Sequence, residues 1–384
     1  MNIFLIAGEP SGDALGAALM AGFAELVPGC RFAGVGGEGM AEAGLTSLFP
    51  MSDLSVMGLA EVLPRISLLR RRITQTAQAI AEQRPDLVVT IDSPDFCLRV
   101  LKRARAARPD LPVVHYVAPS VWAWRPKRAA RMAPLVDHVL ALLPFEPPYM
   151  QAAGMSCDFV GHPVVAAPRA TQAEAQAIRQ AQTVVLALPG SRGGEIARLA
   201  PRFGQALGQA LPPGAQVLVP TVAAQAEHMR AQVARWPVPA QVLTESAQKR
   251  AAFRAADVAL AASGTVSLEL AANDTPMVIG YDMAWLTQRI AERLIKLDTV
   301  TLVNLVSETR AVPEYLGRAC TADNLAQGLR NLLADPARQA DQRAAMRLTM
   351  DRLGQGGDAP GYRAAASCLA FMSRKAGGGP SPVP

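Results

Sequence analysis

Asp92 is a candidate for acid–base chemistry because of its residue type and its position in the sequence. It follows the apolar run Leu87–Ile91, which reads as a buried strand, and the carboxyl end of such a strand lies at the ligand-binding edge of a parallel sheet. There, Asp92 could accept a proton from a hydroxyl group that acts as a nucleophile. Capping of the next helix is the common alternative use of an aspartate at this point. For Asp95 we favour that alternative, as the cap of a helix that begins near Phe96.

Two strand–glycine–helix turns in the second half of the sequence could hold a diphosphate. Val184–Leu188 leads into Pro-Gly-Ser-Arg-Gly-Gly-Glu (189–195), and Val258–Ala261 leads into Ser-Gly-Thr-Val-Ser-Leu-Glu (263–269). Backbone N–H groups at a helix start, joined by an arginine in the turn, attract phosphate oxygens. Glu269 could accept both hydroxyl groups of a ribose, although in a purely structural helix it would only face solvent. We therefore predict a nucleotide site formed by Ser191, Arg192, Ser263, Gly264, Thr265 and Glu269.

A further glycine turn, Gly-Glu-Pro-Ser-Gly-Asp (8–13), follows the first apolar run. Its candidate ligand contacts are Gly8, Ser11 and Gly12, because glycine lets the backbone approach a ligand closely. If the turn is only structural, Ser11 or Asp13 would be a helix cap. The dinucleotide signature GxGxxG is absent, so a dinucleotide cofactor is not predicted.

The sequence carries no metal or disulfide signature. Its four histidines have no ligand spacing, its five cysteines are widely separated without a CxxC pair, and it has no DxD motif of the kind that holds a metal on a sugar nucleotide. We therefore expect a reaction without metal or cofactor, in a reducing compartment. His115 lies in a predicted strand, where a hydrogen-bonded core residue is more common than a catalyst.

The elements that must position these residues are short buried strands alternating with helices, a rhythm typical of doubly wound α/β domains. We predict two such Rossmann-like domains facing a cleft, with the ligand-binding turns at the carboxyl ends of the strands. The predicted strands are Ile3–Ala7, Leu87–Ile91, Val113–Val117, Val139–Leu142, Val184–Leu188, Val217–Val219, Val258–Ala261 and Pro276–Ile279. The predicted helices of the first half are Ala14–Leu26, Ile66–Gln83 and Leu98–Ala107.

A change of composition at Pro163–Gln182, with two prolines and then an Ala/Gln-rich stretch, predicts the connection between the domains. Residues 1–165 then form the first domain and residues 166–344 the second, which carries the nucleotide turns. The stretch Ala337–Met372 is predicted to be helical. The Gly- and Pro-rich end, residues 374–384, is predicted to be a disordered tail.

Composition excludes some protein classes and indicates an anionic partner. Half of the 384 residues are apolar and 18% are charged, which excludes a disordered chain. The net charge is +6, and the stretch Cys97–Arg131 holds nine basic residues against one acid. Such a stretch suits phosphates, nucleic acid or acidic lipid, while a solvated helix face is the alternative.

An apolar segment followed by arginines has the composition of a membrane-surface anchor. Residues 54–69 are strongly apolar, too short to span a bilayer, and precede Arg70, Arg71 and Arg72. The mean hydropathy of +0.16 is high for a soluble enzyme and is consistent with an apolar surface. A buried core helix is the ordinary alternative. The predicted membrane contacts are Val56, Met57, Leu59, Val62, Leu63, Leu68 and Leu69.

Segments along most of the chain resemble, in order, those of the lipid-A-disaccharide synthases, which are glycosyltransferases of the two-domain GT-B fold. HYVAPSVWAW is far more specific than any glycine turn, and the resemblance extends from the first strand to about Asn304. The segments are AGEPSGD (7–13), GVGG (34–37), VMGLAEVL (56–63), IDSPDF (91–96), HYVAPSVWAWRPKR (115–128), LPFE (143–146), GHP (161–163), LPGSRGGEI (188–196), SGTVSLE (263–269) and PMVIGY (276–281).

The resemblance implies a reaction in which UDP-2,3-diacylglucosamine and 2,3-diacylglucosamine 1-phosphate (lipid X) give the β-1′,6-linked disaccharide 1-phosphate and UDP. It implies Asp92 as the base for the acceptor hydroxyl, Arg192 on the diphosphate, and Asn304 as a functional residue. We expect direct displacement with inversion. Pro10 departs from the family, where a threonine is expected. A C-terminal helix, about residues 345–373, is expected to pack on the first domain.

The expected partners are the two acylated substrates and the anionic surface of the inner membrane, which the protein would bind peripherally from the cytoplasm. Nucleic acid is not an expected partner, and a homodimer is left open. One rival is a UDP-sugar 2-epimerase, which would lack the apolar segment and need no lipid acceptor. The other is a nucleotide-binding regulator or nucleic-acid module using the stretch Cys97–Arg131, whose affinity would fall steeply with salt.

Overall fold

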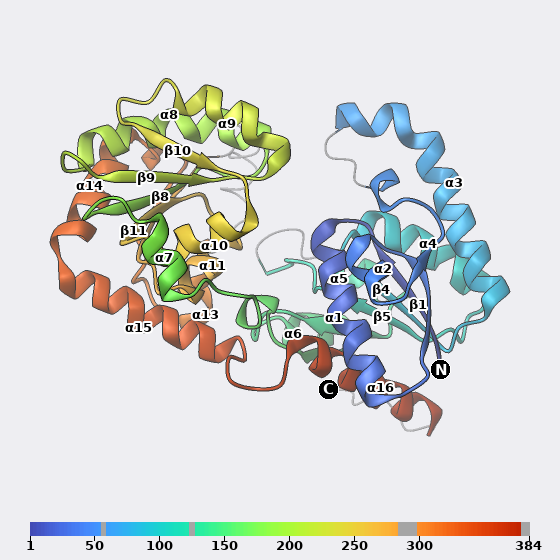
Figure 1. Ribbon diagram of the computed structural model, residues 1–384. Coiled ribbons are helices and arrows are strands. Elements are labelled where there is room, and N and C mark those ends of the chain that lie inside the picture. Colours follow the sequence, from blue (N-terminus) through green and yellow to red (C-terminus); the bar gives the residue numbers. More distant parts are fainter. Residues whose placement is uncertain (55–58, 123–126, 283–297, 378–384) are drawn as a thin grey trace. The chain divides into compact units, whose positions relative to one another are not determined.

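The computed structural model describes residues 1–54, 59–122, 127–282 and 298–377, and of residues 59–65 it describes the backbone only (Figure 1). The chain divides into two compact units. Unit 1 comprises Met1–Pro163 and Gly356–Pro384, and unit 2 comprises Val164–Gln355. Each unit contains one parallel sheet with helices packed on it, so the predicted α/β fold class is confirmed.

Unit 1 is built on a seven-stranded parallel sheet. Its strands are β1 (Asn2–Ala7), β2 (Arg31–Val35), β3 (Thr46–Ser47), β4 (Leu87–Ile91), β5 (Val113–Tyr116), β6 (His138–Ala141) and β7 (Ser156–Phe159). They lie in the order β3-β2-β1-β4-β5-β6-β7, so the first strand of the chain is internal and its last residue, Ala7, pairs with Ile91. The glycine turn after β1 and the Asp92 turn after β4 are therefore neighbours.

Helices pack on both faces of this sheet. Along β1 the side chains of Phe4 and Ile6 join one core cluster with α3 and α4, while those of Ile3 and Leu5 join another with α1 and α16. Burial on both faces explains why these strands are continuously apolar. The described helices of unit 1 are α1 (Pro10–Leu26), α2 (Glu38–Glu42), α3 (Leu59–Gln83), α4 (Pro94–Ala107), α5 (Lys127–Met132), α6 (Pro147–Gln151) and α16 (Pro360–Ala376).

The last helix returns to the first one, because α16 packs on α1 (Figure 1). Two glycines make this close approach feasible. A Cβ atom on Gly361 would lie 2.3 Å from the carbonyl oxygen of Ala18, and one on Gly22 would lie 2.5 Å from the carbonyl oxygen of Gly361. Further along α16, the Ser367 hydroxyl lies 2.8 Å from Nε2 of the buried His138.

Unit 2 is built on a six-stranded parallel sheet. Its strands are β8 (Val184–Leu188), β9 (Gln216–Pro220), β10 (Ala240–Leu243), β11 (Val258–Ala261), β12 (Met277–Tyr281) and β13 (Glu314–Leu316), in the order β10-β9-β8-β11-β12-β13. Its described helices are α7 (Gln172–Ile178), α8 (Gly193–Ala210), α9 (Ala226–Val233), α10 (Ser246–Ala255), α11 (Val266–Ala272), α13 (Leu302–Ser307), α14 (Ala322–Ala334) and α15 (Pro336–Arg352). The carboxyl ends of β9, β8 and β11 are adjacent, which brings the two predicted nucleotide turns together.

The structure corrects the predicted boundary near the C-terminus. The stretch expected to be one helical region is two helices, α15 and α16, and α15 belongs to unit 2, where it packs on α11 and α13. Unit 2 thus extends to Gln355 instead of 344. The start of the expected disordered tail is also wrong, because α16 continues to Ala376; residues 378–384 lie outside the described part. No helix in the described part of the chain is both long and apolar enough to cross a membrane.

Candidate functional site

A cavity of about 380 Å³ in unit 2 collects the predicted nucleotide residues. It lies at the ends of β8 and β9, at Leu188 and Pro220, and at Ala262 directly after β11. The six predicted residues that line it are Ser191, Arg192, Ser263, Gly264, Thr265 and Glu269. Residues that are up to 78 positions apart in the sequence therefore share one site because adjacent parallel strands end at the same edge.

The turn after β8 is shaped by a left-handed glycine. Gly190 has φ +114°, a backbone conformation that is strained for any other residue, and a Cβ atom there would also displace the Glu195 carboxylate, whose Oε2 would lie 2.3 Å away. The same carboxylate oxygen accepts a hydrogen bond of 3.2 Å from the Ser191 N–H. Arg192 is the exposed N-cap residue of α8, an 18-residue helix whose positive end faces any anion in the turn. The turn thus combines a guanidinium group with a helix start, two features that attract anions.

The turn after β11 presents its backbone in the same way. Gly264 has φ +136°, and no atom of the described residues, its chain neighbours aside, lies within 4 Å of the place where its Cβ would be. The backbone at this position is therefore open to the cavity. Thr265 is the N-cap residue of α11, and the Ser267 hydroxyl donates to the Gly264 carbonyl oxygen at 2.9 Å. Glu269 is exposed, yet the chain packed around its carboxyl group raises its pKa, an effect that nearby Lys249 opposes. A ligand hydroxyl would find an acceptor at this point.

Several cavity residues were not predicted. Thr221 and Val222 directly follow β9, and the rule that strand ends line the site would have found them. The Thr221 hydroxyl has no hydrogen-bond partner within the described residues, and Val222 is 43% exposed. Lys249 and Phe253 come from α10, and no motif in the sequence marks them.

In unit 1, Asp92 occupies a strained turn directly after β4. Asp92 and Ser93 both have left-handed backbone conformations, with φ +49° and +42°, and Val117 at the end of the neighbouring strand has φ +82°. Such values are costly for residues other than glycine, and for a β-branched valine most of all. The Asp92 N–H donates to the Tyr116 carbonyl oxygen at 3.0 Å, which ties the two strand ends together. The Asp92 side chain is partly exposed at this edge.

The predicted acceptor-side loop lies against the same turn. A Cβ atom on Gly8 would lie 2.6 Å from the Ser93 hydroxyl oxygen, so glycine is needed there. Gly12 faces the Ile91 carbonyl at ordinary van der Waals distance, and Ser11 is exposed in the first turn of α1. The structure therefore brings Gly8, Gly12 and the Asp92 turn together within unit 1.

Asp13 has a role that we did not predict. It does not cap its own helix; instead its carboxylate accepts hydrogen bonds from the N–H groups of Gly37 (2.7 Å), Gly39 (2.8 Å) and Met40 (3.1 Å). Gly37 is the N-cap residue of α2, and Gly39 and Met40 lie in its first turn, so Asp13 caps a helix that begins 25 residues further along the chain. A distant partner of this kind leaves no local signal in the sequence.

The predicted capping role of Asp95 is wrong. Ser93 occupies the N-cap position of α4, and Asp95 lies in the first turn with 91% of its side chain exposed, 3.5 Å from Arg128. Pro94 explains the earlier helix start, because proline is favoured at the first helical position.

The loop after β5 is anchored by a buried acid. His115 is a core residue whose Nδ1 lies 2.7 Å from the Thr90 hydroxyl, and burial lowers its pKa to about 4. Glu146 is 4% exposed and accepts hydrogen bonds from the Trp122 indole N–H (3.2 Å) and the Leu143 N–H (3.0 Å). Burial raises the pKa of Glu146 to about 7. A carboxylate that titrates near neutrality thus holds the tryptophan loop.

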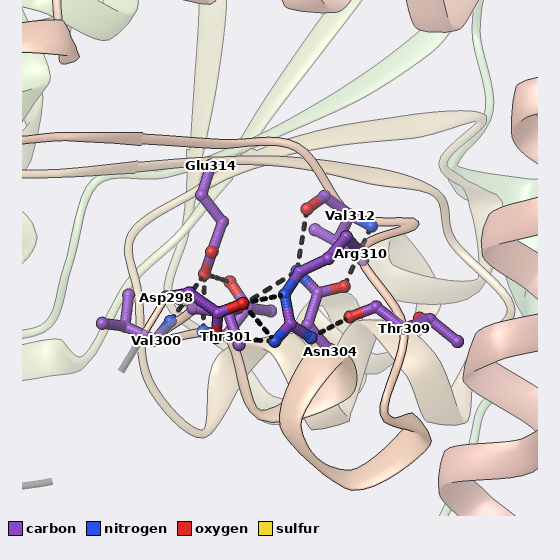
Figure 2. Close-up of polar contacts among 9 residues, drawn as sticks. Asp298, Val300, Thr301, Asn304, Thr309, Arg310, Val312 and Glu314 are labelled. Atoms are coloured by element: carbon purple, nitrogen blue, oxygen red, sulfur yellow. Dashed lines mark hydrogen bonds and ion pairs between the residues drawn. The ribbon is translucent and has the colours of Figure 1, made fainter. Parts of the chain in front are cut away.

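Asn304 lies at the buried start of α13, in the network drawn in Figure 2. Its amide NH₂ donates to the Thr299 hydroxyl (3.2 Å) and to the Val312 carbonyl oxygen (2.9 Å), and its carbonyl oxygen accepts from the Val312 N–H (3.0 Å). The residue is 1% exposed. Its amide is engaged on both atoms by the protein itself, and it is not among the residues that line the cavity.

The predicted membrane contacts are only partly described. Val56 and Met57 lie outside the described residues, and Leu59, Val62 and Leu63 belong to the stretch of α3 with described backbone only. Leu68 and Leu69 are half-buried on α3. Of the arginines that follow, Arg70 and Arg71 are exposed, whereas the guanidinium of Arg72 binds Asp53 at 2.6 Å and lies 4.5 Å from the Phe49 ring centroid.

Solved structures with the same fold include enzymes that act on UDP-sugars. A UDP-N-acetylglucosamine 2-epimerase from Neisseria meningitidis bound to UDP-GlcNAc aligns with a TM-score of 0.61 at 10% identity, covering 97% of this chain and 99% of its own. MurG from Acinetobacter baumannii aligns with a TM-score of 0.57 at 15% identity and the same coverage. At such identities the likeness establishes the GT-B type of fold and no more.

Sequence comparison identifies one family among the proteins that share this fold. The Lipid-A-disaccharide synthetase family profile matches residues 3–360. A lipid-A-disaccharide synthase from Ruegeria pomeroyi is 59% identical, covering 96% of this chain and 95% of the relative. Another from Rhodospirillum centenum is 47% identical, covering 97% and 95%. The chain therefore belongs to the lipid-A-disaccharide synthase family and is a glycosyltransferase of lipid A biosynthesis.

Proposed function

We propose that this protein transfers 2,3-diacylglucosamine from UDP to the 6-hydroxyl group of 2,3-diacylglucosamine 1-phosphate, with inversion at the anomeric carbon. The observation that carries the proposal is the cavity in unit 2, because six residues chosen from sequence for nucleotide binding line it together. The family gives the class of reaction, and the shared lining of this cavity supports a donor-nucleotide site in unit 2. The fold alone would equally suit an epimerase.

The donor side stabilises the leaving group. Negative charge grows on the β-phosphate of UDP as the glycosidic bond breaks, and Arg192 and the amino-terminal ends of α8 and α11 offer positive potential at that point. Glu269 accepts hydrogen bonds from the ribose hydroxyl groups. Because a guanidinium and helix starts supply the counter-charge, we propose that catalysis needs no metal or cofactor.

On the acceptor side, Asp92 acts as the general base. Its carboxylate takes the proton of the acceptor 6-hydroxyl as that oxygen attacks the anomeric carbon from the side opposite UDP. One displacement then forms the new bond while the bond to UDP breaks, so the configuration inverts. The strained backbone at residues 92 and 93 supports the proposal, because such strain concentrates at functional sites.

Both substrates carry acyl chains, so we propose that the protein works on the anionic cytoplasmic face of the inner membrane. The apolar segment from Val56 to Leu69 would enter the acyl boundary, while the exposed Arg70 and Arg71 contact headgroup phosphates. Arg72 is excluded from this role by its pairing with Asp53. A homodimer is compatible with this arrangement and is not required by it.

Two arginines of the basic stretch Cys97–Arg131 serve internal contacts, which counts against a nucleic-acid surface, and we do not propose that partner. Arg105 pairs with Asp137 at 2.6 Å, and Arg108 donates to the Pro85 carbonyl oxygen at 2.8 Å. Charges that serve internal contacts are not available for a row of phosphates.

A UDP-release assay with purified protein tests the proposal. UDP-2,3-diacylglucosamine should release UDP only when the monosaccharide 1-phosphate acceptor is present, and EDTA should not change the rate. Release without acceptor, together with a change in the sugar at C2, would favour an epimerase. Salt-sensitive nucleic-acid binding with no UDP release would favour the non-enzymatic alternative. Loss of activity in EDTA that Mg²⁺ restores would contradict the metal-free mechanism.

A further inference from the structure

One carboxylate oxygen on the edge strand β13 holds the segment that precedes α13. Oε1 of Glu314 accepts hydrogen bonds from the Val300 N–H (3.0 Å), the Thr301 N–H (2.6 Å) and the Thr301 hydroxyl (Figure 2). Thr301 is fully buried, and Glu314 is partly buried. Three donors converging on one charged acceptor fix this segment far more firmly than a single neutral hydrogen bond would.

Asn304 secures the same segment from the other side. Its amide NH₂ donates to the buried Thr299 hydroxyl, while its bonds to both backbone groups of Val312 tie α13 to the turn before β13. Residues 299–301 are therefore held between a carboxylate and an amide. Asn304 bonds the side chain of Thr299, whereas Glu314 bonds the backbone N–H groups of Val300 and Thr301.

The held segment touches the donor cavity. The Val300 carbonyl oxygen lies 3.5 Å from the hydroxyl oxygen of Ser263, a long hydrogen bond but a direct contact, and Ser263 lines the cavity next to Gly264. The Val300 residue thus faces Glu314 through its N–H and Ser263 through its C=O. Neither Glu314 nor Asn304 lines the cavity, so we expect them to act on it indirectly, and the contact between Val300 and Ser263 offers such a route.

We propose that Glu314 is a positioning residue of the donor-nucleotide site, which it serves by holding residues 299–301 against Ser263. Asn304 supports the same segment, which gives that residue a function without substrate contact. The inference rests on the proposed function, because it takes the cavity as the UDP site. Removal of the Glu314 carboxylate leaves two N–H groups and a hydroxyl without their acceptor, and the segment must move to satisfy them.

Variants at both ends of the contact test the proposal. Glu314→Ala should weaken UDP binding, measured by calorimetry, and raise the KM for the UDP-sugar by about tenfold, while kcat and the KM for the acceptor change less than about twofold. Glu314→Gln keeps one acceptor oxygen without the charge, so its donor KM should lie between those of the unmodified protein and Glu314→Ala. Thr301→Val removes one of the three groups that donate hydrogen bonds to Glu314, and it should raise the KM for the UDP-sugar. Thr301→Ser keeps the hydroxyl group and should have the KM of the unmodified protein.

Two controls separate positioning from a general loss of stability. Arg310→Ala breaks the exposed pair with Asp298, 2.6 Å apart in the same region, and should leave UDP binding unchanged (Figure 2). Thr321→Ala removes the N-cap bond of α14, made at 3.3 Å to the Asn324 N–H, and should lower the melting temperature without affecting the donor KM.

The outcomes distinguish the inference from the proposed function. If the unmodified protein binds UDP but Glu314→Ala binds it equally well, the inference alone is overturned. The same holds if Thr321→Ala raises the donor KM as much as Thr301→Val does, or if Thr301→Ser behaves like Thr301→Val. If the unmodified protein binds no UDP, both the proposed function and the inference are overturned.

Discussion

Two consecutive left-handed residues, Asp92 and Ser93, set the geometry of the acceptor turn. Each such conformation costs of the order of 1–3 kcal/mol, and the contacts around it must offset that cost. The hydrogen bond from the Asp92 N–H to the Tyr116 carbonyl oxygen is one of these contacts. Gly8 leaves room for the Ser93 side chain, because it has no Cβ atom of its own. The residue at the N-cap position of α4 is Ser93 and not Asp92.

Asp92→Asn should abolish transfer while UDP still binds. Asparagine has nearly the same shape but cannot accept the proton of the acceptor hydroxyl, so we expect kcat to fall by about 10²- to 10⁴-fold with the Kd for UDP unchanged. Asp95→Asn is the matched control, because Asp95 lies in the same turn with 91% of its side chain exposed. Full activity of the Asp92 variant in a UDP-release assay would refute the role of this residue as base.

Glu146 should make the stability of the protein depend on pH. Burial raises its pKa from 4.5 to about 7, so between these values the folded protein holds a proton that the unfolded chain releases. The free energy of unfolding should therefore decrease as pH rises through this window, by up to about 3 kcal/mol. Glu146→Gln cannot titrate, and denaturant unfolding at several pH values should show a flatter profile. An unchanged slope in the variant would contradict the prediction.

At the scale of residues, the two strand–glycine–helix motifs line one cavity, because each turn directly follows a strand and the ends of β8 and β11 are adjacent. Nucleotide binding at this cavity stays a prediction. Lys249 could not be predicted, because it reaches the cavity from a helix with no motif of its own. Asp13 could not be assigned either, because its three partners lie at least 24 residues away. The sequence marked Asn304 only by resemblance and gave no sign that its amide is fully engaged within the protein.

At the scale of elements, the central strands were predictable and the outer ones were not. β4, β8 and β11 have the predicted bounds, because burial on both faces makes them continuously apolar. β10 and β13 are edge strands with mixed burial, and a short half-exposed strand resembles a loop in sequence. Their positions depend on pairing with a neighbour that sequence alone does not reveal.

The contact between α1 and α16 should be sensitive to a single methyl group. Gly361→Ala places a Cβ atom 2.3 Å from the Ala18 carbonyl oxygen, a backbone atom that cannot move aside. We expect the free energy of unfolding to fall by about 1–3 kcal/mol, as measured by denaturant unfolding. Gly377→Ala, at the end of the same helix, meets its nearest atom at 3.5 Å and should have little effect. Equal stability of the two variants would show that the helices can shift apart.

At the scale of the whole molecule, the order of elements is predictable, but the point where the chain passes from unit 2 back to unit 1 is not. In sequence, α15 is a polar helix that could belong to either unit. In the structure it packs on α11 and α13 and therefore belongs to unit 2. The Asp92 turn and the nucleotide cavity lie in different units, so the proposed reaction requires both.

The proposed membrane anchor should be separable from catalysis. Replacement of Val56, Leu59, Leu63 and Leu69 by serine should reduce co-sedimentation of the purified protein with anionic lipid vesicles, because each lost apolar side chain removes about 1.5–3 kcal/mol of burial. Leu348→Ser is the control, since Leu348 is an exposed hydrophobic residue (38%) on α15 in unit 2. Partitioning that stays the same in the fourfold variant would count against the anchor.

The return of α16 to α1 has a consequence for biosynthesis. Gly22 leaves the ribosome early, but its packing partner Gly361 is translated near the end, and at about 5–20 residues per second the interval is tens of seconds. Unit 2, which spans Val164–Gln355, can emerge and fold as one continuous stretch during that time. During that interval α1 already packs on its face of the unit 1 sheet, but the apolar side chains that contact α16 stay without this partner.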